Sequence, residues 1–459
     1  MDYVSTRNSS NIFKFKDVFI KGLADDGGLF IPKSLQKYKK NDLFEFKNLE
    51  YKELAKKIIH PFIGDFMSEN DLSKIIDKSY SAFRKKNVVD IIEVGDRSIL
   101  ELFHGPTLAF KDIAMQLLGN FYEYYLNNEN EKINIVVATS GDTGAAAIDA
   151  IKGKDNVNIF VLHPNNRVSP VQRKLMTTGK EKNVFNIAVD GNFDDCQNLV
   201  KAMFADKFFS KEIKMSGVNS INWARIIAQS VYYFYSYFLI EENNKPINFS
   251  VPTGNFGDVY AGYLAKKMGL PINKLIVSTN ENDILQRVIN RGEYKPDDVK
   301  PSLSPSMDIQ VASNFERLLF YIVGEDSDKV NSMMNSLHDK GFFQLNKNEI
   351  NEIKKDFLAV KVSDKETLSI IKEVYEKNQF ILDPHTATAF GAIKENNDIS
   401  NLVALGTAHP YKFFETVKKA TGKDVSPPKQ VEKIVDKDEK FDILENNISE
   451  VKKYILNKI

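Results

Sequence analysis

Short apolar runs rich in β-branched residues alternate with helical patterns through most of the chain. The runs at residues 133–138, 157–162, 184–189, 247–251, 274–278 and 402–405 predict strands. Helical patterns are found over 143–150, from about 194 and over 259–265. Strands that alternate with helices indicate parallel sheets with helical crossovers. The series is too long for one open sheet, so the pattern predicts two α/β units with a ligand site between them.

The first 83 residues follow a different pattern, with apolar positions at helical spacing over 54–59 and 71–77. Asp71 is expected to cap the second of these helices. We therefore expect three domains: a mainly helical extension over 1–83, an α/β domain over 84–215 and a larger α/β domain over 216–459. Residues 426–440 are rich in charge and contain a Pro pair, which predicts a surface connection to a final helix.

The most aromatic segment, residues 231–240, predicts a buried helix whose Tyr hydroxyl groups need hydrogen-bond partners. It is far shorter than the ~20 apolar residues that a membrane span requires. The N-terminal residues lack the basic stretch and apolar run that are typical of a secretory signal. These features together predict a cytosolic protein without a membrane partner.

Composition and charge exclude several classes of partner and site. The 459 residues include 62 Lys and Arg against 62 Asp and Glu, so no basic surface for nucleic acid is expected. The single cysteine, Cys196, rules out a disulfide framework and a Cys-rich zinc site. The six histidines show none of the common metal-binding spacings, so no metal is expected.

One lysine, Lys111, ends an apolar run that follows a Gly-Pro turn, and it precedes a helical pattern over 113–118. An ammonium group held beside Leu108, Ala109 and Phe110 is poorly solvated. Desolvation favours the neutral amine, which is the nucleophilic form. A neutral lysine in this position is what a Schiff base to an aldehyde cofactor requires.

Two loops have the character of anion sites. The sequence Ala-Thr-Ser-Gly-Asp-Thr-Gly over 138–144 follows a strand and opens a helix, so its N–H groups and the helix dipole favour an anion. The loop over 251–258 repeats this arrangement, and its glycines, Gly254 and Gly257, are expected to permit positive φ. It lacks the Lys-Ser/Thr pair of a nucleotide P-loop, which favours a metal-free phosphate nest.

A third loop over 405–410 again follows an apolar strand and presents the neutral hydroxyl group of Thr407. The three loops and the buried lysine together fit a phosphorylated aldehyde cofactor. One loop would bind its phosphate, the Thr407 hydroxyl its ring nitrogen, and the remaining loop the substrate.

These motifs resemble the threonine synthase family, which are pyridoxal-phosphate enzymes of the tryptophan-synthase-β fold group. The resemblance extends over nearly the whole chain and includes further motifs at residues 3–7, 22–29, 220–225, 304–310, 313–317 and 383–386. It is closest to the long microbial and fungal class with an N-terminal helical extension, rather than the plant class. The resemblance implies two parallel-sheet α/β domains with pyridoxal 5'-phosphate in the cleft between them.

The resemblance also implies roles for individual residues. Lys111 would hold the cofactor as a Schiff base, and Thr407 would bind the pyridine nitrogen and leave it largely unprotonated. The cofactor phosphate would be surrounded by Gly254, Asn255, Phe256, Gly257 and Asp258. The Asp258 carboxylate should turn away from that phosphate or offer only its N–H group. The residues expected to bind the substrate are Ser140, Asp142, Thr143, Asn222, Arg225 and Arg317.

The reaction implied is the conversion of O-phospho-L-homoserine and water to L-threonine and phosphate, the last step of threonine biosynthesis. It would proceed by γ-elimination and β-hydration, with Lys111 as the group that moves protons, which makes the chain a carbon–oxygen lyase. The alternative is an O-phosphohomoserine phospho-lyase that gives 2-oxobutyrate, ammonia and phosphate. A monomer or small homo-oligomer is expected.

Other classes fit the sequence less well. Threonine dehydratase and cysteine synthase carry an asparagine loop where this chain has Ser-Gly-Asp-Thr-Gly. A dinucleotide-binding oxidoreductase would need GxGxxG and an acidic residue about 20 positions further on, and no such pair is present. A catalytically inactive scaffold would be expected to lack the lysine or the phosphate loop, and the chain has both.

Overall fold

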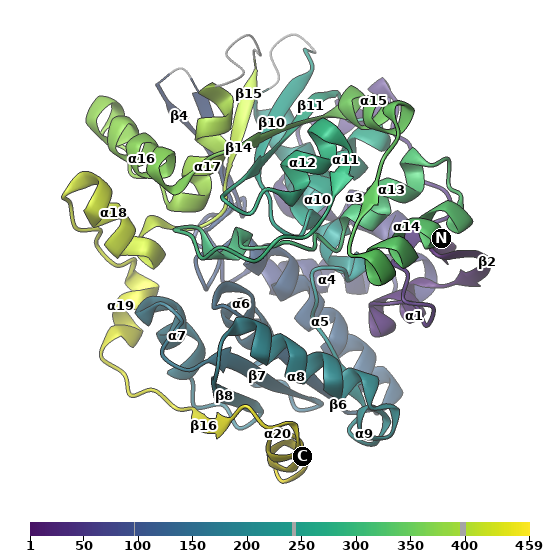
Figure 1. Cartoon of the computed structure of the whole chain (residues 1–459), viewed down its shortest axis with the longest axis vertical. Coiled ribbons are helices and arrows are strands. Elements are labelled where there is room, and N and C mark those ends of the chain that lie inside the picture. Colours follow the sequence, from purple (N-terminus) through teal and green to yellow (C-terminus); the bar gives the residue numbers. More distant parts are fainter. Residues whose placement is uncertain (96, 241–244, 395–400) are drawn as a thin grey trace.

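The computed structural model describes residues 1–95, 97–240, 245–394 and 401–459, and it contains two parallel-stranded sheets with helices on both faces (Figure 1). The larger sheet has the strand order β14-β11-β10-β15-β5-β4 within these residues. Its pairs are parallel except for the edge strand β4, which is antiparallel to β5. The strands are β4 (Asp90–Val94), β5 (Arg97–Glu101), β10 (Ile247–Pro252), β11 (Ile272–Thr279), β14 (Phe357–Lys361) and β15 (Leu402–Gly406).

The smaller sheet has the order β16-β8-β7-β6-β9 among the described residues, and all its pairs are parallel. Its strands are β6 (Ile133–Ala138), β7 (Val157–Pro164), β8 (Val184–Asp190), β9 (Met215–Ser216) and β16 (Asp442–Glu445). The predicted strands over 133–138, 157–162, 184–189, 247–251, 274–278 and 402–405 are therefore confirmed as β6, β7, β8, β10, β11 and β15.

The predicted strands read as continuous apolar runs because both faces of each sheet are covered. In β11, Leu275 and Val277 pack into the core beneath α10 (Trp223–Ile240) and α11 (Gly257–Lys267). Ile276, between them, points into a second core beneath α16 (Asp364–Asn378) and α17 (Pro384–Lys394). This alternation is the two-residue period of a strand that is buried on both sides.

The smaller sheet is covered in the same way. One face packs against α5 (Lys111–Glu129) and α6 (Asp142–Ile151), and the other against α8 (Phe193–Ala205) and α20 (Ile448–Leu456). The remaining helices of this half are α7 (Pro170–Thr177), α9 (Lys207–Glu212) and α19 (Lys429–Val435). The remaining elements of the larger half are α12 (Ile284–Arg291), β12 (Glu293–Tyr294), η2 (Pro305–Met307), α13 (Phe315–Ile322), α14 (Ser327–Lys340), β13 (Phe343–Gln344), α15 (Lys347–Asp356), η3 (Pro410–Phe413) and α18 (Phe414–Thr421).

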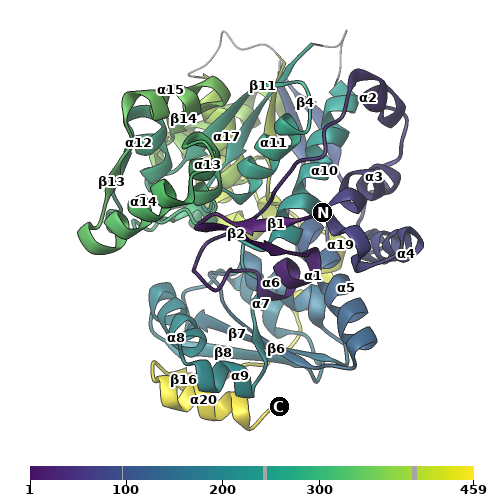
Figure 2. The ribbon, with the colours of Figure 1, turned by 90° about the vertical axis from the view of Figure 1, so that its right-hand side faces the viewer.

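The N-terminal region is helical but begins with an antiparallel sheet of order β2-β1-β3, which lies across the middle of the molecule (Figure 2). Its elements are β1 (Tyr3–Ser5), β2 (Asn8–Phe13), α1 (Phe15–Lys21), β3 (Phe30–Pro32), α2 (Lys40–Phe46), α3 (Tyr51–Ile63), η1 (Gly64–Phe66) and α4 (Glu69–Tyr80). The expected cap of α4 is wrong, because Ser68 caps the helix and its hydroxyl accepts from the N–H group of Asp71. A hydroxyl one residue before the first turn reaches that N–H group directly.

The two sheets do not follow continuous ranges of the sequence. Strands β4 and β5 lie within 84–215 but belong to the larger sheet, in which β5 pairs with β15 from the 216–459 range. Strand β16, near the C-terminus, pairs with β8 of the smaller sheet. The segment over 426–440 contains α19, and Figure 1 shows the chain running down from α18 through α19 to β16 and α20. The C-terminal segment therefore returns the chain from the larger half to the smaller one.

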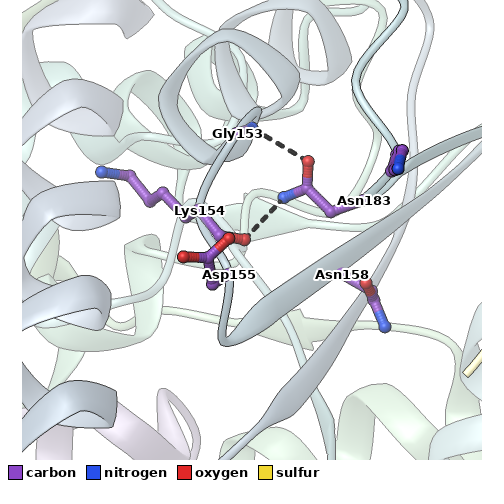
Figure 3. Close-up of a pocket in the computed structure, with 6 residues that line it drawn as sticks. Gly153, Lys154, Asp155, Asn158 and Asn183 are labelled. Carbon is purple, nitrogen blue, oxygen red and sulfur yellow. Dashed lines mark hydrogen bonds between the residues drawn. The ribbon is translucent and has the colours of Figure 1, made fainter.

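The loop after β6 and the loops before β7 and β8 lie at opposite edges of the smaller sheet. Figure 3 shows a surface hollow at the edge where β7 and β8 begin, lined by Gly153, Lys154 and Asn183. Asn183 accepts from the Gly153 N–H group and donates to the Lys154 carbonyl, so it holds this loop together. The loop after β6 lies at the other edge, where the strands end.

None of the helices in the described ranges has the length and apolar character needed to cross a membrane.

Candidate active site

Lys111 is the first residue of α5, and a short backbone pairing fixes the loop before it. Ala109 pairs with Ala408 in an antiparallel bridge, and the Phe110 N–H group donates to the Thr407 carbonyl over 2.9 Å. Leu108 adopts a positive φ of 63°, which turns the chain into this bridge. The pairing brings the lysine loop and the Thr407 loop together, as the sequence predicted for a common site.

The Lys111 side chain lies in a nearly closed, mixed environment. The residue is 9% exposed, and Nζ lies 4.9 Å from the centre of the Phe110 ring. Its nearest charged partner is Asp142, with Nζ and Oδ2 3.5 Å apart. Burial lowers the pKa of Lys111; Asp142 opposes this effect, and the cations Lys412 and Arg225 add to it. The direction is the one expected for a lysine that must become neutral.

Asp142 begins α6 and is the most heavily bonded carboxylate of the site. Lys412 Nζ lies 2.6 Å from its Oδ1, which also accepts from Gln172 Nε2 over 2.7 Å. Ser306 Oγ donates to Oδ2 over 2.9 Å. Burial alone would raise the pKa of Asp142, but Lys412 and Lys111 hold it well below its usual range. Asp142 is therefore an ionised group shared between two buried lysines.

Three of these partners were missed in the sequence: Lys412, Ser306 and Gln172. Lys412 is fully buried and also donates from Nζ to the Thr107 carbonyl over 2.9 Å. It lies between Tyr411 and Phe413, an aromatic context like that of Lys111, and this was the signal available in the sequence. Its pairing with Asp142 joins positions 270 residues apart, which no local pattern reveals.

The loop before α6 keeps several donors available. Thr139 Oγ1 accepts from the N–H groups of Gly141 and Gly144, which shapes the loop from within. Ser140 and Thr143 are only half-buried. In the described parts of the chain, the N–H groups of Ser140 and Thr143 donate no hydrogen bond. With the positive end of the α6 dipole they form a small anion site.

The loop between β10 and α11 has the same character, but its glycines act differently from the prediction. The residue with positive φ is Phe256, at 63°, whereas Gly254 and Gly257 do not adopt it. They are needed for close approach: a Cβ atom on Gly254 would lie 3.0 Å from the Ser306 carbonyl oxygen. Across the described residues, the N–H groups of Asn255, Phe256 and Gly257 donate no hydrogen bond. They form a nest suited to a phosphate.

Asp258 turns its side chain away from this nest into the core. Its Oδ1 accepts hydrogen bonds from the hydroxyl groups of Tyr232 and Tyr233, the latter over 2.9 Å. Burial raises the pKa of Asp258 to about 6. The two tyrosines belong to the aromatic segment of α10, whose hydroxyl groups were expected to need partners.

The two arginines expected near the substrate have different surroundings. Arg317 is fully buried and donates to the carbonyl groups of Phe30 and Ile221 over 3.0 and 2.6 Å. Its guanidinium group also lies 5.4 Å from the ring of Trp223. Arg225 donates from Nη1 to the Val218 carbonyl, and its buried Nε has no partner among the residues that the structure describes. Arg225 therefore has free donors and Arg317 is committed to the fold.

Asn222 and Thr407 complete the expected set. Asn222 donates to the Phe19 carbonyl over 2.9 Å and accepts from the Ala224 N–H group, so its amide supports the start of α10. Thr407 is buried at the end of β15, and its N–H group donates to Thr386 Oγ1. His385, next to Thr386, accepts from the Ser306 N–H group at Nε2.

Three family models match successive parts of the chain. Threonine synthase N terminus matches residues 2–80, Pyridoxal-phosphate dependent enzyme residues 100–404, and Threonine synthase, C-terminal residues 386–455. A threonine synthase of Pseudomonas aeruginosa is 44% identical over 99% of this chain and 98% of its own length. The chain belongs to the threonine synthase family. A threonine synthase of Saccharomyces cerevisiae is also 44% identical, over 91% of this chain and 88% of its own.

A solved structure of this family gives the same result in three dimensions. The crystal structure of a PLP-bound threonine synthase from Brucella melitensis has a TM-score of 0.96 and 43% identity, and the match covers 100% of this chain and 99% of that one. The family predicted from the motifs, the α/β fold with parallel-sheet domains and the cofactor, pyridoxal phosphate, are thereby confirmed.

The groups that the structure brings together at this site fit pyridoxal phosphate. The aldehyde requires an amine, and Lys111 is a buried lysine with a lowered pKa. The phosphate requires donors without a competing carboxylate, and the N–H groups of residues 255–257 are free while the Asp258 side chain points into the core. This chain therefore has suitable groups for both the aldehyde and the phosphate of the cofactor.

Proposed function

We propose that this chain converts O-phospho-L-homoserine and water to L-threonine and phosphate, with Lys111 as its catalytic residue. The observation that carries this proposal is the buried Lys111 amine beside the shared carboxylate of Asp142, 3.5 Å away. A lysine in that setting can be held neutral, accept a proton and return it. The family of the chain and its cofactor supply the chemical setting.

Residues from both halves would hold the cofactor. Lys111 would carry it covalently, and the N–H groups of Gly254, Asn255, Phe256, Gly257 and Asp258 would surround its phosphate. Thr407 would place a neutral hydroxyl group at the ring nitrogen. A hydroxyl group there leaves the nitrogen largely unprotonated, because no carboxylate shares a proton with it.

The substrate carries a carboxylate and a phosphate, and two groups of donors suit them. We assign the carboxylate to the loop over 140–143, through the hydroxyl and N–H groups of Ser140 and Thr143. The Asp142 carboxylate would repel an anion, so it acts in this loop on Lys111 rather than on the substrate. We assign the substrate phosphate to Arg225, because Arg317 and Asn222 use their donors within the fold.

The chain moves protons at three substrate atoms. When bound, pyridoxal phosphate supplies an electron sink for the charge that forms at the substrate Cα. Lys111 Nζ accepts the proton from Cα and, after releasing it, a proton from Cβ. Protons return to Cγ once the phosphate has left and to Cα after water has added, while Arg225 stabilises the phosphate as it leaves Cγ. A water molecule adds at Cβ. Asp142 stabilises the ammonium form of Lys111 between these steps.

The test is a product balance with the cofactor-loaded protein. O-phosphohomoserine is added, and phosphate, threonine and 2-oxobutyrate are quantified together. Phosphate matched by threonine, and abolished in Lys111→Ala, is the expected result. Phosphate matched by 2-oxobutyrate would identify the phospho-lyase instead, and the absence of phosphate would contradict both. The cytosolic location and the monomeric or small oligomeric state stay predictions.

A further inference from the structure

The site contains a second buried lysine whose function is not explained by binding cofactor or substrate. The Lys412 side chain is completely inaccessible to solvent, and its two acceptors are Asp142 Oδ1 at 2.6 Å and the Thr107 carbonyl at 2.9 Å. Thr107 belongs to the loop that leads into Lys111, and Asp142 is the carboxylate that Lys111 approaches. Lys412 therefore binds both the loop that precedes Lys111 and the carboxylate beside it.

A count of charges shows what this arrangement does. With Lys111 protonated, the three groups Lys111, Asp142 and Lys412 carry a net charge of one in a buried place; with Lys111 neutral, they carry none. Buried net charge is costly, so the trio favours the neutral amine. Without Lys412, the protonated Lys111 and Asp142 would form a neutral ion pair, and the proton would be held in place.

We propose that Lys412 is a positioning residue for Lys111: by serving as the counter-ion of Asp142, it prevents that carboxylate from holding Lys111 in its protonated form. The distances indicate that Lys412 is the main counter-ion, because Asp142 lies 2.6 Å from Lys412 but 3.5 Å from Lys111. The pKa of Lys111 is also lowered by the charge of Lys412. The inference rests on the proposed attachment of the cofactor to Lys111 and not on the identity of the substrate.

Other charged groups face this trio from the elements around it, and each is retained in the variants below. They are Asp112 on α5, Arg225 on α10, Asp258 on α11, His385 on α17 and His409 at the start of η3. Asp112 accepts two hydrogen bonds from Thr107, and His385 is bonded to Asp383. Because none of them contacts the Lys412 side chain through a hydrogen bond or ion pair in the described residues, replacing that side chain leaves their own bonds intact.

In the experiment, the absorbance of the cofactor-loaded protein is followed without substrate as the pH is varied. The quantity measured is the pH at the midpoint of the absorbance change. In Lys412→Met the Lys111 nitrogen is the only cationic partner left to pair with the Asp142 carboxylate among these three groups. The carboxylate then favours the protonated form of that nitrogen. We expect the midpoint to rise by about one pH unit or more, and kcat at neutral pH to fall at least about tenfold. Lys412→Arg keeps the charge, so its midpoint should stay close to that of the unchanged protein.

A matched control separates this effect from the loss of any ion pair. Lys452 forms an equally short but partly exposed pair with Asp206, 2.5 Å apart, at the far end of the smaller half. Lys452→Met should leave the midpoint unchanged. If Lys412→Met lowers thermal stability but leaves the midpoint where it is, Lys412 has only a structural role and the inference is wrong.

A second variant tests the same charges from the other side, should Lys412→Met fail to fold. Asp142→Asn keeps the size of the side chain but leaves two ammonium groups without their carboxylate. The midpoint should then fall by about one pH unit or more, and an unchanged or higher midpoint would overturn the inference. A titration that persists in Lys111→Ala would contradict the attachment itself and the inference with it. An unchanged midpoint in Lys412→Met, with a titration that depends on Lys111, contradicts only the inference.

Discussion

Ser306 Oγ donates a hydrogen bond to Asp142 Oδ2 over 2.9 Å, and this bond joins the two halves of the molecule at the candidate active site. Ser306 lies in η2, in the segment that follows β12 of the larger half, whereas Asp142 begins the helix that follows β6 of the smaller half. The Ser306 N–H group donates in turn to His385 Nε2 over 3.3 Å. Ser306 therefore links the carboxylate beside Lys111 to the larger half.

Ser306→Ala should weaken catalysis more than folding. The change removes one donor from a buried carboxylate, which costs about 1–3 kcal/mol, and Asp142 can then move closer to Lys111. We expect kcat/KM for O-phosphohomoserine to fall about tenfold, and Tm to fall by only a few degrees because the protein is large. Ser306→Thr retains the hydroxyl group and is the control. Equal kinetics of Ser306→Ala and the unchanged protein would contradict this role.

The sequence predicted six of the buried strands but missed β14, which is also mostly buried, and the exposed β16. Strands β6, β10 and β11 read as continuous apolar runs because helices cover both of their faces. Strand β16 is mostly exposed, with Ile443 56% exposed, so its four residues carry no such signal. Its place beside β8, like that of β5 beside β15, depends on pairing between segments far apart, and that is why the expected domain ranges do not follow the sheets.

The loops of the site were predicted because Gly, Thr and Asp at the ends of strands have local consequences. The details that depend on tertiary contacts were not. The positive φ falls on Phe256 rather than on a glycine, since its ring packs against Phe315 and Phe357 in the core. Lys412 was missed for the same reason: its partner, Asp142, comes from the other half.

The two arginines should respond to substitution in opposite ways. Arg225→Met removes a buried guanidinium group with an unpartnered Nε, and kcat/KM for O-phosphohomoserine should fall about a hundredfold. Competitive inhibition by inorganic phosphate should be lost as well. Arg317→Met should leave phosphate inhibition intact but lower Tm, because the carbonyl groups of Phe30 and Ile221 lose their donor. If phosphate inhibition depends on Arg317 and not on Arg225, the assignment is reversed.

Asp112 should make the stability of the protein depend on pH. Burial raises the pKa of Asp112 to about 7, although the Thr107 hydroxyl and N–H groups that donate to it oppose the rise. A folded-state pKa raised above the model value of 3.8 means that the protonated carboxyl group stabilises the fold. That contribution is present in full near pH 4 and is lost as the pH rises to about 7.

Asp112→Asn removes this dependence. An amide can accept from the Thr107 N–H group and donate to its hydroxyl oxygen, so both hydrogen bonds can persist. Relative to the variant, the unchanged protein should lose on the order of 4 kcal/mol of stability between about pH 4 and pH 7. Thermal unfolding of both proteins across this range measures the difference. A difference that stays constant with pH would show that Asp112 is ionised throughout.

The close approach of Gly254 to the Ser306 carbonyl predicts an effect on cofactor binding. A Cβ atom at Gly254 would lie 3.0 Å from that backbone oxygen and 3.2 Å from Met307 Cα, so Gly254→Ala must displace a backbone segment. At Gly257 a Cβ atom would lie 3.3 Å from a side-chain nitrogen, Asn314 Nδ2, and no closer than 3.8 Å to backbone, the Ser220 carbonyl oxygen, so the backbone need not move. Neither glycine has a positive φ, so the difference between them is steric.

We therefore expect Gly254→Ala to raise the Kd for pyridoxal phosphate by about tenfold or more, as overpacking costs typically 1–3 kcal/mol. Gly257→Ala should raise it less. Absorbance titration of the cofactor-free protein measures both values, and kinetics add a second readout, because the displaced segment carries Ser306 and its bond to Asp142. Gly254→Ala should accordingly lower kcat even at saturating cofactor, whereas Gly257→Ala should not. If the two variants rank in the opposite order, the contact with the Ser306 backbone does not shape the phosphate nest.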